Sequence, residues 1–412
     1  MRILLLNQFF WPDSAPTSLL LTDLARELAA RGHDVVAVCG NSNYVGPGAK
    51  GEVSTIEVRR TPTLKFARGT AARLLSYTSF LGSALGAGLL GEKPDLVITL
   101  TTPPLLSSVG TMMKSLRGCR HWIWEMDVYP DVAVELGWIK KNSALERLIG
   151  FMTDWPRQKA DGILVLGECM KQRLMNRGIT DEHLYVAENW ADGRDIKPVP
   201  FPDQPLLQVL YSGNLGLAHE VETIEQAAFE MDEAPVAEFV FAGGGPKRKA
   251  LEERCASRKL EHVNFRGYSS AEELGESLGK GDVGLVTQRR ECIGTVVPSK
   301  VYALMASGRP ILYIGPEEST PHRIIGKFHC GWQINPGDVH GLKELLRTLA
   351  SNRRLVHEAG NNARRAFLEN YDLPIGVGRI ADMIGARPLD AERNKRGSGE
   401  MRQREVKTPA VA

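Results

Sequence analysis

The segment that decides the fold is Val283-Gly-Leu-Val-Thr-Gln-Arg-Arg-Glu291-Cys-Ile-Gly-Thr-Val-Val-Pro298-Ser-Lys300-Val-Tyr-Ala-Leu-Met-Ala-Ser-Gly308-Arg-Pro310. It begins as an apolar strand, continues through a glycine-containing loop and enters a helix near residue 299, which Gly308 ends before the next strand. Backbone N–H groups at a helix start, next to a lysine, favour a phosphate or diphosphate. The segment therefore predicts a ligand-facing edge of an α/β sheet.

Length and composition are those of a two-domain globular protein. The chain has 412 residues, whereas one domain takes roughly 100–200. The formal net charge of +2 gives no support to a nucleic-acid partner. The six cysteines are far apart without a Cys-x-x-Cys pair, which favours buried thiols in a reducing cytosol over disulfides or a metal cluster. The start, residues 1–7, is too short for a signal peptide and predicts a first strand.

Strands alternate with helices along the first half of the chain. Apolar runs at 3–6, 34–39, 95–99, 121–125 and 162–166 predict strands, and leucines at helical spacing between residues 20 and 28 predict a helix. Such alternation indicates a parallel sheet covered by helices on both faces. Proline density at Pro198-Val-Pro-Phe-Pro202 then predicts an interdomain linker.

The same pattern restarts after the linker. Strands are expected at 208–211, 238–241, 263–266, 283–286 and 311–314, with glycine loops at 212–216 and 242–246. We predict an N-terminal acceptor-side domain over 1–198 and a C-terminal nucleotide-sugar-binding domain over 203–371. A helix at about 372–385 is expected to pack back on the first domain, and 386–412 to be a disordered tail. In two doubly wound domains, ligands bind beyond the carboxyl ends of the strands.

Several motifs in order resemble one known family. They are Asn7-Gln-Phe-Phe-Trp-Pro12, Leu24-Ala-Arg-Glu-Leu-Ala-Ala-Arg-Gly-His33, Met126-Asp-Val-Tyr-Pro130, Glu188-Asn-Trp-Ala-Asp192, Tyr211-Ser-Gly-Asn-Leu-Gly216, Gly243-Gly-Gly-Pro246 and Pro298-Ser-Lys300. Together they resemble the family 4 glycosyltransferases of GT-B fold, in particular the branch that builds bacterial exopolysaccharide, colanic acid and O-antigen. The resemblance covers roughly residues 1–385. It implies two Rossmann-like domains facing across a cleft and retaining transfer from a nucleotide sugar, usually a UDP-sugar, without a metal or other cofactor.

The resemblance also assigns candidate donor-binding residues. They are Gly213, Asn214, Gly216, Gly243, Gly244, Lys247, Arg266, Gly267, Tyr268, Arg290, Gly294, Thr295, Ser299 and Lys300. Three positions depart from the family pattern, since Asn214 stands for an arginine, His219 for a lysine and Ala303 for the ribose-binding glutamate. Lys300 is then the main candidate for offsetting the diphosphate charge, against the alternative of a surface lysine. Tyr268 could stack on or contact the nucleobase, or pack against the core.

Two carboxylates are candidate catalytic residues. Glu291 would face the donor sugar, with a solvated loop charge as the alternative. Asp127 follows a buried strand and could contact a sugar hydroxyl or receive the acceptor proton, although the family's leaving phosphate is also proposed as that base. On the acceptor side we expect Phe10, Trp11 and Asp13, where the aromatic rings could stack on sugar or lipid or simply fill the core.

Residues 74–90 are apolar and follow the basic residues Arg59, Arg60, Lys65, Arg68 and Arg73. The run is shorter than the roughly 20 residues that span a bilayer. It could rest on an anionic membrane or be a buried helix of the first domain. The predicted location is accordingly the cytoplasm, with peripheral contact at the inner membrane face left open.

The expected activity is transfer of a sugar, such as an N-acetylated amino sugar, from a UDP donor to a lipid-linked, for example polyprenyl-linked, or soluble saccharide acceptor. Two rivals stay open. One is a nucleotide-sugar 2-epimerase on the same fold, and the other is a degenerate, non-catalytic nucleotide- or glycan-binding protein, which the departures at Asn214 and Ala303 would explain.

Overall fold

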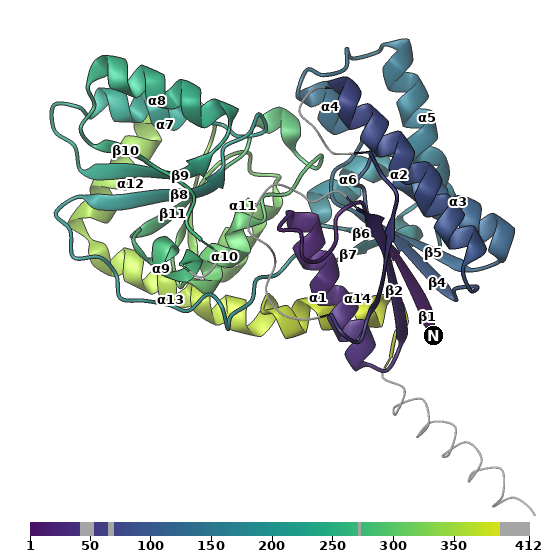
Figure 1. The fold of residues 1–412 in the computed structure, drawn as a ribbon. Helices are drawn as coiled ribbons and strands as arrows, with labels where there is room; N and C mark the ends of the chain where they lie inside the picture. Colours follow the sequence, from purple (N-terminus) through teal and green to yellow (C-terminus); the bar gives the residue numbers. More distant parts are fainter. Residues whose placement is uncertain (42–52, 65–69, 271–272, 388–412) are drawn as a thin grey trace, which may run out of the picture. The chain divides into compact units, whose positions relative to one another are not determined.

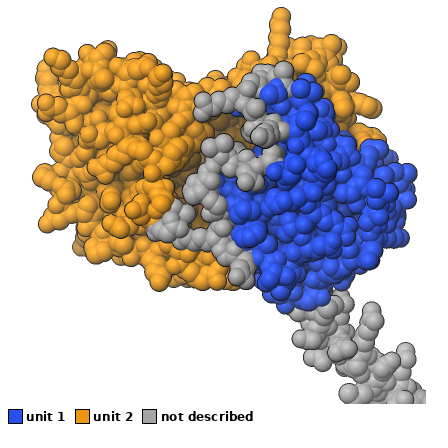
Figure 2. Space-filling view, viewed as in Figure 1, with its two compact units in different colours: residues 1–124, 159–163, 377–412 blue, residues 125–158, 164–376 orange. Residues whose placement is uncertain are grey.

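The computed structural model describes residues 1–41, 53–64, 70–270 and 273–387 (Figure 1). The chain divides into two compact units (Figure 2). Unit 1 contains residues 1–124, 159–163 and 377 onward, and unit 2 contains residues 125–158 and 164–376. The predicted tail beyond residue 387 lies outside the described residues.

The first sheet has the strand order β3-β2-β1-β4-β5-β6-β7. Its strands are β1 Arg2–Leu6, β2 Asp34–Gly40, β3 Glu57–Thr61, β4 Leu96–Thr99, β5 Arg120–Glu125, β6 Gly162–Val165 and β7 Leu184–Val186. From β3 to β5, neighbours pair in parallel, with Arg2 beside Asp34 and Ile3 beside Leu96. Strands buried on both faces are apolar throughout, which is why the five apolar runs of the first half were predictable.

Two strands of this sheet were not predicted. β3 is an edge strand whose sequence, Glu-Val-Arg-Arg-Thr, leaves most side chains partly or fully exposed. β7 has only three residues at the opposite edge. Edge strands can carry polar residues because solvent reaches them, so neither has the apolar signal on which the prediction depended.

Helices α1 to α6 occur among the strands of the first sheet along the chain, and α14 comes after the second sheet. Their bounds are α1 Pro16–Ala30, α2 Thr70–Leu90, α3 Leu106–Arg117, α4 Asp131–Glu135, α5 Ala144–Lys159, α6 Glu168–Asn176 and α14 Leu373–Met383, with the 3-10 turn η1 at Asp181–His183. α1 starts with Pro16 and buries Leu21, Leu24 and Leu28 on one face, as the helical spacing predicts.

The second sheet has the order β10-β9-β8-β11-β12-β13, and all its pairings are parallel. Its strands are β8 Leu207–Asn214, β9 Ala237–Gly244, β10 Val263–Arg266, β11 Val283–Thr287, β12 Ile311–Ile314 and β13 Gly331–Ile334. The chain order reverses between β8 and β11. The carboxyl ends of two such strands are where ligands bind in open α/β sheets.

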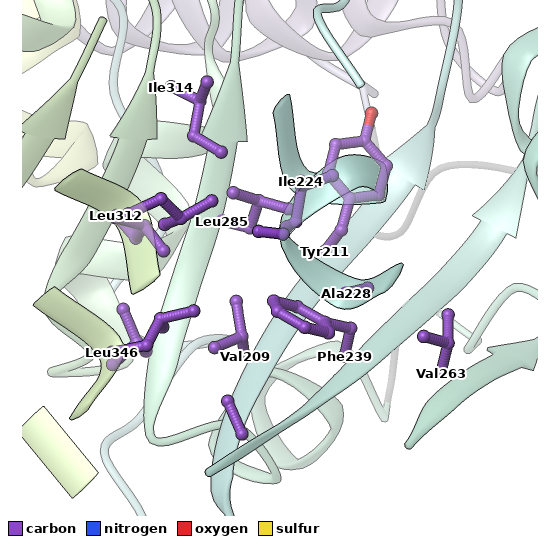
Figure 3. Packing of buried hydrophobic residues seen from close by; sticks show 14 of the residues in the cluster. Val209, Tyr211, Ile224, Ala228, Phe239, Val263, Leu285, Leu312, Ile314 and Leu346 are labelled. Carbon is purple, nitrogen blue, oxygen red and sulfur yellow. The ribbon is translucent and has the colours of Figure 1, made fainter. Parts of the chain in front are cut away.

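Seven helices of the described chain accompany this sheet: α7 Glu222–Glu230, α8 Pro246–Arg258, α9 Leu274–Gly279, α10 Lys300–Ala306, α11 Thr320–Phe328, α12 Val339–Ser351 and α13 Arg353–Asn370, with the 3-10 turn η2 at Arg290–Cys292. Figure 3 shows part of the core that holds them together. Side chains of β8, β9 and β11, such as Val209, Phe239 and Leu285, lie beside Ile224 of α7 and Leu346 of α12. This core fixes the strand ends that carry the glycine loops.

The predicted linker, residues 198–202, lies between β7 and β8 along the chain. Arg309 holds it from the second-sheet side, because its buried guanidinium donates to the carbonyls of Val199 and Pro200 at 3.0 and 2.8 Å and lies over the ring of Phe201. The compact units group residues 125–158 and 164–198 with the second sheet, so the limits 1–198 and 203–371 stay predictions. The end of α14 belongs to unit 1, where Arg31 pairs with Asp382 at 2.5 Å.

The apolar run 74–90 is part of α2, and it is half buried. Ser76, Phe80 and Ala84 face the interior, whereas Leu74 and Leu75 are exposed. Arg60 donates to the carbonyl of Trp11 at 2.5 Å, while Lys65 and Arg68 lie outside the described residues. Within the described part of the chain, no helix combines the length and the apolar character needed to cross a bilayer.

Candidate donor site

The carboxyl ends of β8 and β9 form the floor of the candidate site. The sequence predicted loops at 212–216 and 242–246, and that prediction is wrong for residues 212–214 and 242–244, because β8 extends through Asn214 and β9 through Gly244. Gly213 pairs with Gly243 and Asn214 with Gly244. A Cβ on Gly243, whose φ is +122°, would lie 2.1 Å from the carbonyl oxygen of Gly213. Glycine is therefore required for the close approach of the two strands.

Lys300 lies over this floor. It is the first residue of α10, and its Nζ is 5.1 Å from the centroid of the Tyr211 ring. A Cβ on Gly213 would lie 2.8 Å from the Lys300 Cε and 3.3 Å from Nζ. Burial lowers the pKa of Lys300 to about 8, and the ammonium forms no ion pair with any residue that the structure describes. A partly buried cation without a carboxylate partner among the described residues, next to glycine backbone, is suited to an anionic ligand.

His219 sits next to Lys300 but does not supply a second charge. Its Nδ1 lies 3.0 Å from the carbonyl oxygen of Thr287, and its Nε2 lies 3.3 Å from the hydroxyl of Tyr211. Because a carbonyl oxygen can only accept, Nδ1 carries the proton. Burial, followed by the charge of Lys300, lowers the pKa of His219 to about 4. The imidazole is therefore neutral at pH 7, and Lys300 carries the local charge.

Two other predicted cations already have partners. Lys247 Nζ donates to the His219 carbonyl at 2.6 Å and pairs with Glu222 at 3.0 Å. Arg290, on η2, pairs loosely with Glu318 at 3.9 Å, and both side chains are exposed. Lys247 thus positions the segment that carries His219, and Arg290 is a solvent-facing residue in this structure.

Glu291 is exposed and paired. Its carboxylate lies 3.3 Å from the Nε of Arg289, and 53% of its side chain is accessible. These are the properties of the solvated alternative. Its catalytic role stays a prediction.

The predicted nucleobase segment lies at the end of β10. Arg266, Gly267 and Tyr268 are exposed, Tyr268 with 67% of its surface. A Cβ on Gly244 would lie 3.0 Å from the Tyr268 hydroxyl. Tyr268 therefore lies beside the end of β9 and not in the core, in a position that leaves its ring available for stacking.

Gln288 shapes the loop between β11 and α10, and sequence reasoning did not single it out. The side chain is buried, and its Nε2 donates to the carbonyls of Cys292 and Val296 at 3.0 Å each. Its Oε1 accepts from the Tyr313 hydroxyl at 3.0 Å. One amide thus closes the loop that leads from Glu291 to Lys300.

Inside that loop, Gly294 and Thr295 are buried, and Ser299 is exposed directly before α10. The Thr295 hydroxyl donates to the Cys292 carbonyl at 3.0 Å, so the side chain stabilises the loop. A Cβ on Gly294, whose φ is +70°, would lie 2.4 Å from the Cys169 carbonyl oxygen. Ser299 therefore presents its side chain to solvent, whereas Gly294 and Thr295 stabilise the conformation of the loop.

A backbone hydrogen bond joins the segment that carries Asp127 to this loop. The N–H of the next residue, Val128, donates to the carbonyl of Thr295 at 2.9 Å, and both belong to unit 2. Burial, with a smaller contribution from Glu125, raises the pKa of Asp127 to about 6. A carboxylate with a pKa near neutrality can accept a proton during catalysis.

Glu125, two residues before Asp127, belongs to a continuous chain of ion pairs. The chain contains seven charged residues: Glu125, Asp131, Glu135, Asp154, Arg157, Arg173 and Arg177. Arg157 is bidentate to the buried Glu125 at 2.6 and 3.2 Å. Asp131 accepts from Arg173 and Arg177 at 2.6 and 2.7 Å and so links the two arginines. We call this set the arginine–carboxylate chain.

The acceptor-side residues belong to unit 1. Phe10 is fully buried, as the core-packing alternative predicts, and Asp13 is buried at 3% exposure. Trp11 keeps part of its surface accessible. Of the three, Trp11 keeps the most accessible surface, and the acceptor-side role of all three stays a prediction.

Comparison with known proteins identifies the family. Residues 194–366 match the model of glycosyl transferases group 1, and residues 20–190 match the glycosyl transferase 4-like domain. The chain is a family 4 glycosyltransferase. The enzyme class predicted from the Pro298-Ser-Lys300 and Tyr211–Gly216 motifs is thus confirmed.

Two curated relatives and one solved structure illustrate the likeness. The chain is 28% identical to WbjE of Pseudomonas aeruginosa, a probable glycosyltransferase, over 80% of this chain and 84% of the relative. It is 25% identical to WcaI of Escherichia coli K12, which bears the name of a colanic acid biosynthesis glycosyl transferase, over 75% and 82% of the two chains. HepE of Anabaena in complex with UDP superposes with a TM-score of 0.68 at 14% identity, over 94% of this chain and 100% of HepE. The fold of this glycosyltransferase is GT-B.

Among the described residues, no group of three or more His, Cys, Asp and Glu side chains is arranged to hold a metal ion. Metal independence stays a prediction of the resemblance. The residues that sequence reasoning missed in this glycosyltransferase are Gln288 and the arginine–carboxylate chain, whose members lie far apart in sequence.

Proposed function

We propose that this glycosyltransferase binds a UDP-sugar at the carboxyl ends of β8, β9 and β11, with the diphosphate against Lys300 and the N-terminal end of α10. The observation that carries the proposal is the Lys300 ammonium, which lies over Gly213 without an ion pair to any described residue. The complexes of HepE with UDP and with UDP-glucose support the donor class.

The proposed reaction is retaining and needs no metal. The bond between the sugar C1 and the diphosphate oxygen breaks, a bond from C1 to an acceptor hydroxyl oxygen forms on the same face, and the acceptor proton passes to the leaving phosphate or to Asp127. Lys300 would stabilise the charge that develops on the leaving diphosphate. Asp127, with a pKa of about 6, would be ionised at pH 7 and able to orient a sugar hydroxyl.

The acceptor is proposed to be a saccharide, lipid-linked or soluble, in the synthesis of a bacterial surface polysaccharide. The likeness to WbjE and to the colanic acid protein WcaI supports this role. We propose an N-acetylated amino sugar as the transferred group, on the resemblance of the whole motif set to the polysaccharide branch.

The decisive experiment combines UDP binding with turnover. UDP should raise the unfolding temperature of the protein, and Lys300→Met should remove most of that shift because it deletes the ammonium and keeps an apolar stem. Lys343→Met is the matched control, since Lys343 of α12 already pairs with Glu230 of α7. A full UDP-dependent shift in Lys300→Met would contradict the assignment of the diphosphate site.

A panel of UDP-sugars, analysed by mass spectrometry with and without saccharide acceptors, tests the reaction class. Transfer or slow hydrolysis with release of UDP supports a glycosyltransferase of this specificity. Conversion of a nucleotide sugar to its 2-epimer would support the first rival. Binding without any product would support a degenerate binding protein, which Ala303 specifically favours because the family's ribose carboxylate is missing there.

A further inference from the structure

Helix α5 exposes an apolar face to solvent. Its buried side is lined by Gly150, Thr153, Pro156 and Arg157. The opposite side carries five large apolar side chains with these exposed fractions: Leu145 53%, Leu148 56%, Phe151 72%, Met152 39% and Trp155 37%. Isolated exposed apolar residues are ordinary on a protein surface, but a contiguous group of this kind marks an interaction site.

The five side chains form one stripe along the helix. At 3.6 residues per turn they fall within an arc of about 120°, and they extend over about three turns. α5 has 16 residues, fewer than the roughly 20 required to span a bilayer. The stripe therefore lies on a surface and does not cross a membrane.

Cations border the stripe. Lys140 and Lys141 are exposed directly before α5, and Arg147 is exposed one position from Leu148. None of the three forms an ion pair with a residue in the described ranges. Asp154 pairs with two arginines, whereas Glu146 accepts from the N–H of Asn142 and keeps its charge. Within residues 140–155 the three exposed cations therefore outnumber the one carboxylate that has no cationic partner among the described residues.

We propose that the α5 stripe, defined as Leu145, Leu148, Phe151, Met152 and Trp155, docks on an anionic lipid surface while Lys140, Lys141 and Arg147 contact the headgroups. An apolar arc bordered by lysine and arginine is the pattern of helices that lie in the membrane interface, and tryptophan is enriched there. Self-association of two copies through the same face is the other outcome, and the oligomeric state in solution separates it from lipid binding. The inference rests on α5 alone and holds for any transferred sugar.

Flotation of the full chain with vesicles tests the proposal. The protein should float with vesicles of phosphatidylcholine and phosphatidylglycerol, and much less with phosphatidylcholine alone or at high salt. The double variant Leu148→Ser, Phe151→Ser and the double variant Lys140→Glu, Lys141→Glu should each lower the bound fraction at least tenfold. All four side chains are exposed, so an unchanged unfolding temperature and UDP-dependent shift will show that folding and donor binding are intact.

Matched controls come from other exposed positions of unit 2. Leu368→Ser removes an apolar side chain that is 49% exposed on α13, and Lys249→Glu reverses a cation that is 82% exposed on α8. Both should bind vesicles like the unmodified protein. Three results would overturn the proposal: no flotation with anionic vesicles, loss of flotation in Leu75→Ser of α2 but not in the α5 variants, or a dimer in solution that Phe151→Ser converts to a monomer.

Discussion

Unit 2 contains two charged regions that differ in how their charges are neutralised. In the arginine–carboxylate chain, each guanidinium contacts at least one carboxylate, and Arg157 with Glu125 is almost fully buried. At the ends of β8 and β11, Lys300 has no such partner among the described residues, and its neighbour His219 is neutral. Buried charges that are paired serve the fold, whereas a partly buried charge left unpaired is available to a ligand.

The largest expected effect comes from breaking the paired region. Arg157→Met leaves the Glu125 carboxylate buried and uncompensated, which should lower the free energy of unfolding by about 3–5 kcal/mol. Chemical denaturation of both proteins measures it. The double variant Glu125→Gln, Arg157→Met should recover much of the loss, because neither charge then remains buried.

Arg354→Met is the control for Arg157, since Arg354 is 85% exposed and pairs with Glu358 one turn away. It should leave stability nearly unchanged. Equal stability of Arg157→Met and the unmodified protein would show that the chain is not a structural element.

A second test asks whether Asp127, at the edge of the paired region, serves the reaction. Asp127→Asn should lower turnover by about 100-fold or more and leave UDP affinity nearly unchanged. Since the carboxylate is the active form and its pKa is about 6, turnover of the unmodified enzyme should fall as the pH drops through about 6. The Asn variant should lose that acid limb.

Asp181→Asn, an exposed pair partner of Lys171, is the matched control and should retain full turnover. If Asp127→Asn is as active as the control, or keeps the acid limb, the residue acts only in the structure of the segment before α4.

A third test restores a carboxylate to the unpaired region. Ala303 lies one turn after Lys300 on α10, where relatives are expected to carry the ribose-binding glutamate. Each charge-assisted hydrogen bond contributes about 1.5–3 kcal/mol, so Ala303→Glu should tighten UDP binding about tenfold or more. Calorimetric titration decides it.

Ala303→Gln separates two effects of that change. A glutamate could pair with Lys300 at this spacing, whereas a glutamine can hydrogen bond the ribose without neutralising the lysine. If both variants bind UDP no better than the unmodified protein, the ribose lies elsewhere and the binding-protein rival gains support.

The smallest expected effect is the pH dependence of the unpaired lysine. The pKa of Lys300 is lowered to about 8 in the free protein, and a bound diphosphate should raise it. UDP affinity should therefore fall several-fold between pH 7.5 and 9 as free Lys300 loses its proton. Titration calorimetry across this range measures the decline. Lys300→Met should show no such decline, and an equal decline in both proteins would assign the titration to another group.

The sequence predicted most of the buried framework but not the pairing of its polar parts. Continuous apolar runs located β1, β2 and the central strands, whereas the polar edge strand β3 had no such signal. Glycines and Lys300 located the candidate site, but the extension of β8 and β9 depends on Gly213 meeting Gly243 across a parallel pair. That contact joins residues distant in sequence.

The sequence by itself determined the two α/β halves, the glycosyltransferase family and Lys300 as the main cation, because strand periodicity, helix starts and short motifs are local properties of the chain. Only the tertiary structure decided which charges are neutralised. It paired Arg157 with Glu125, left Lys300 without a carboxylate among the described residues, made His219 neutral through burial and turned the apolar side of α5 outward. Each of these depends on which distant residues fill the space around a side chain, since electrostatic energies are set by burial and by partners within a few ångströms.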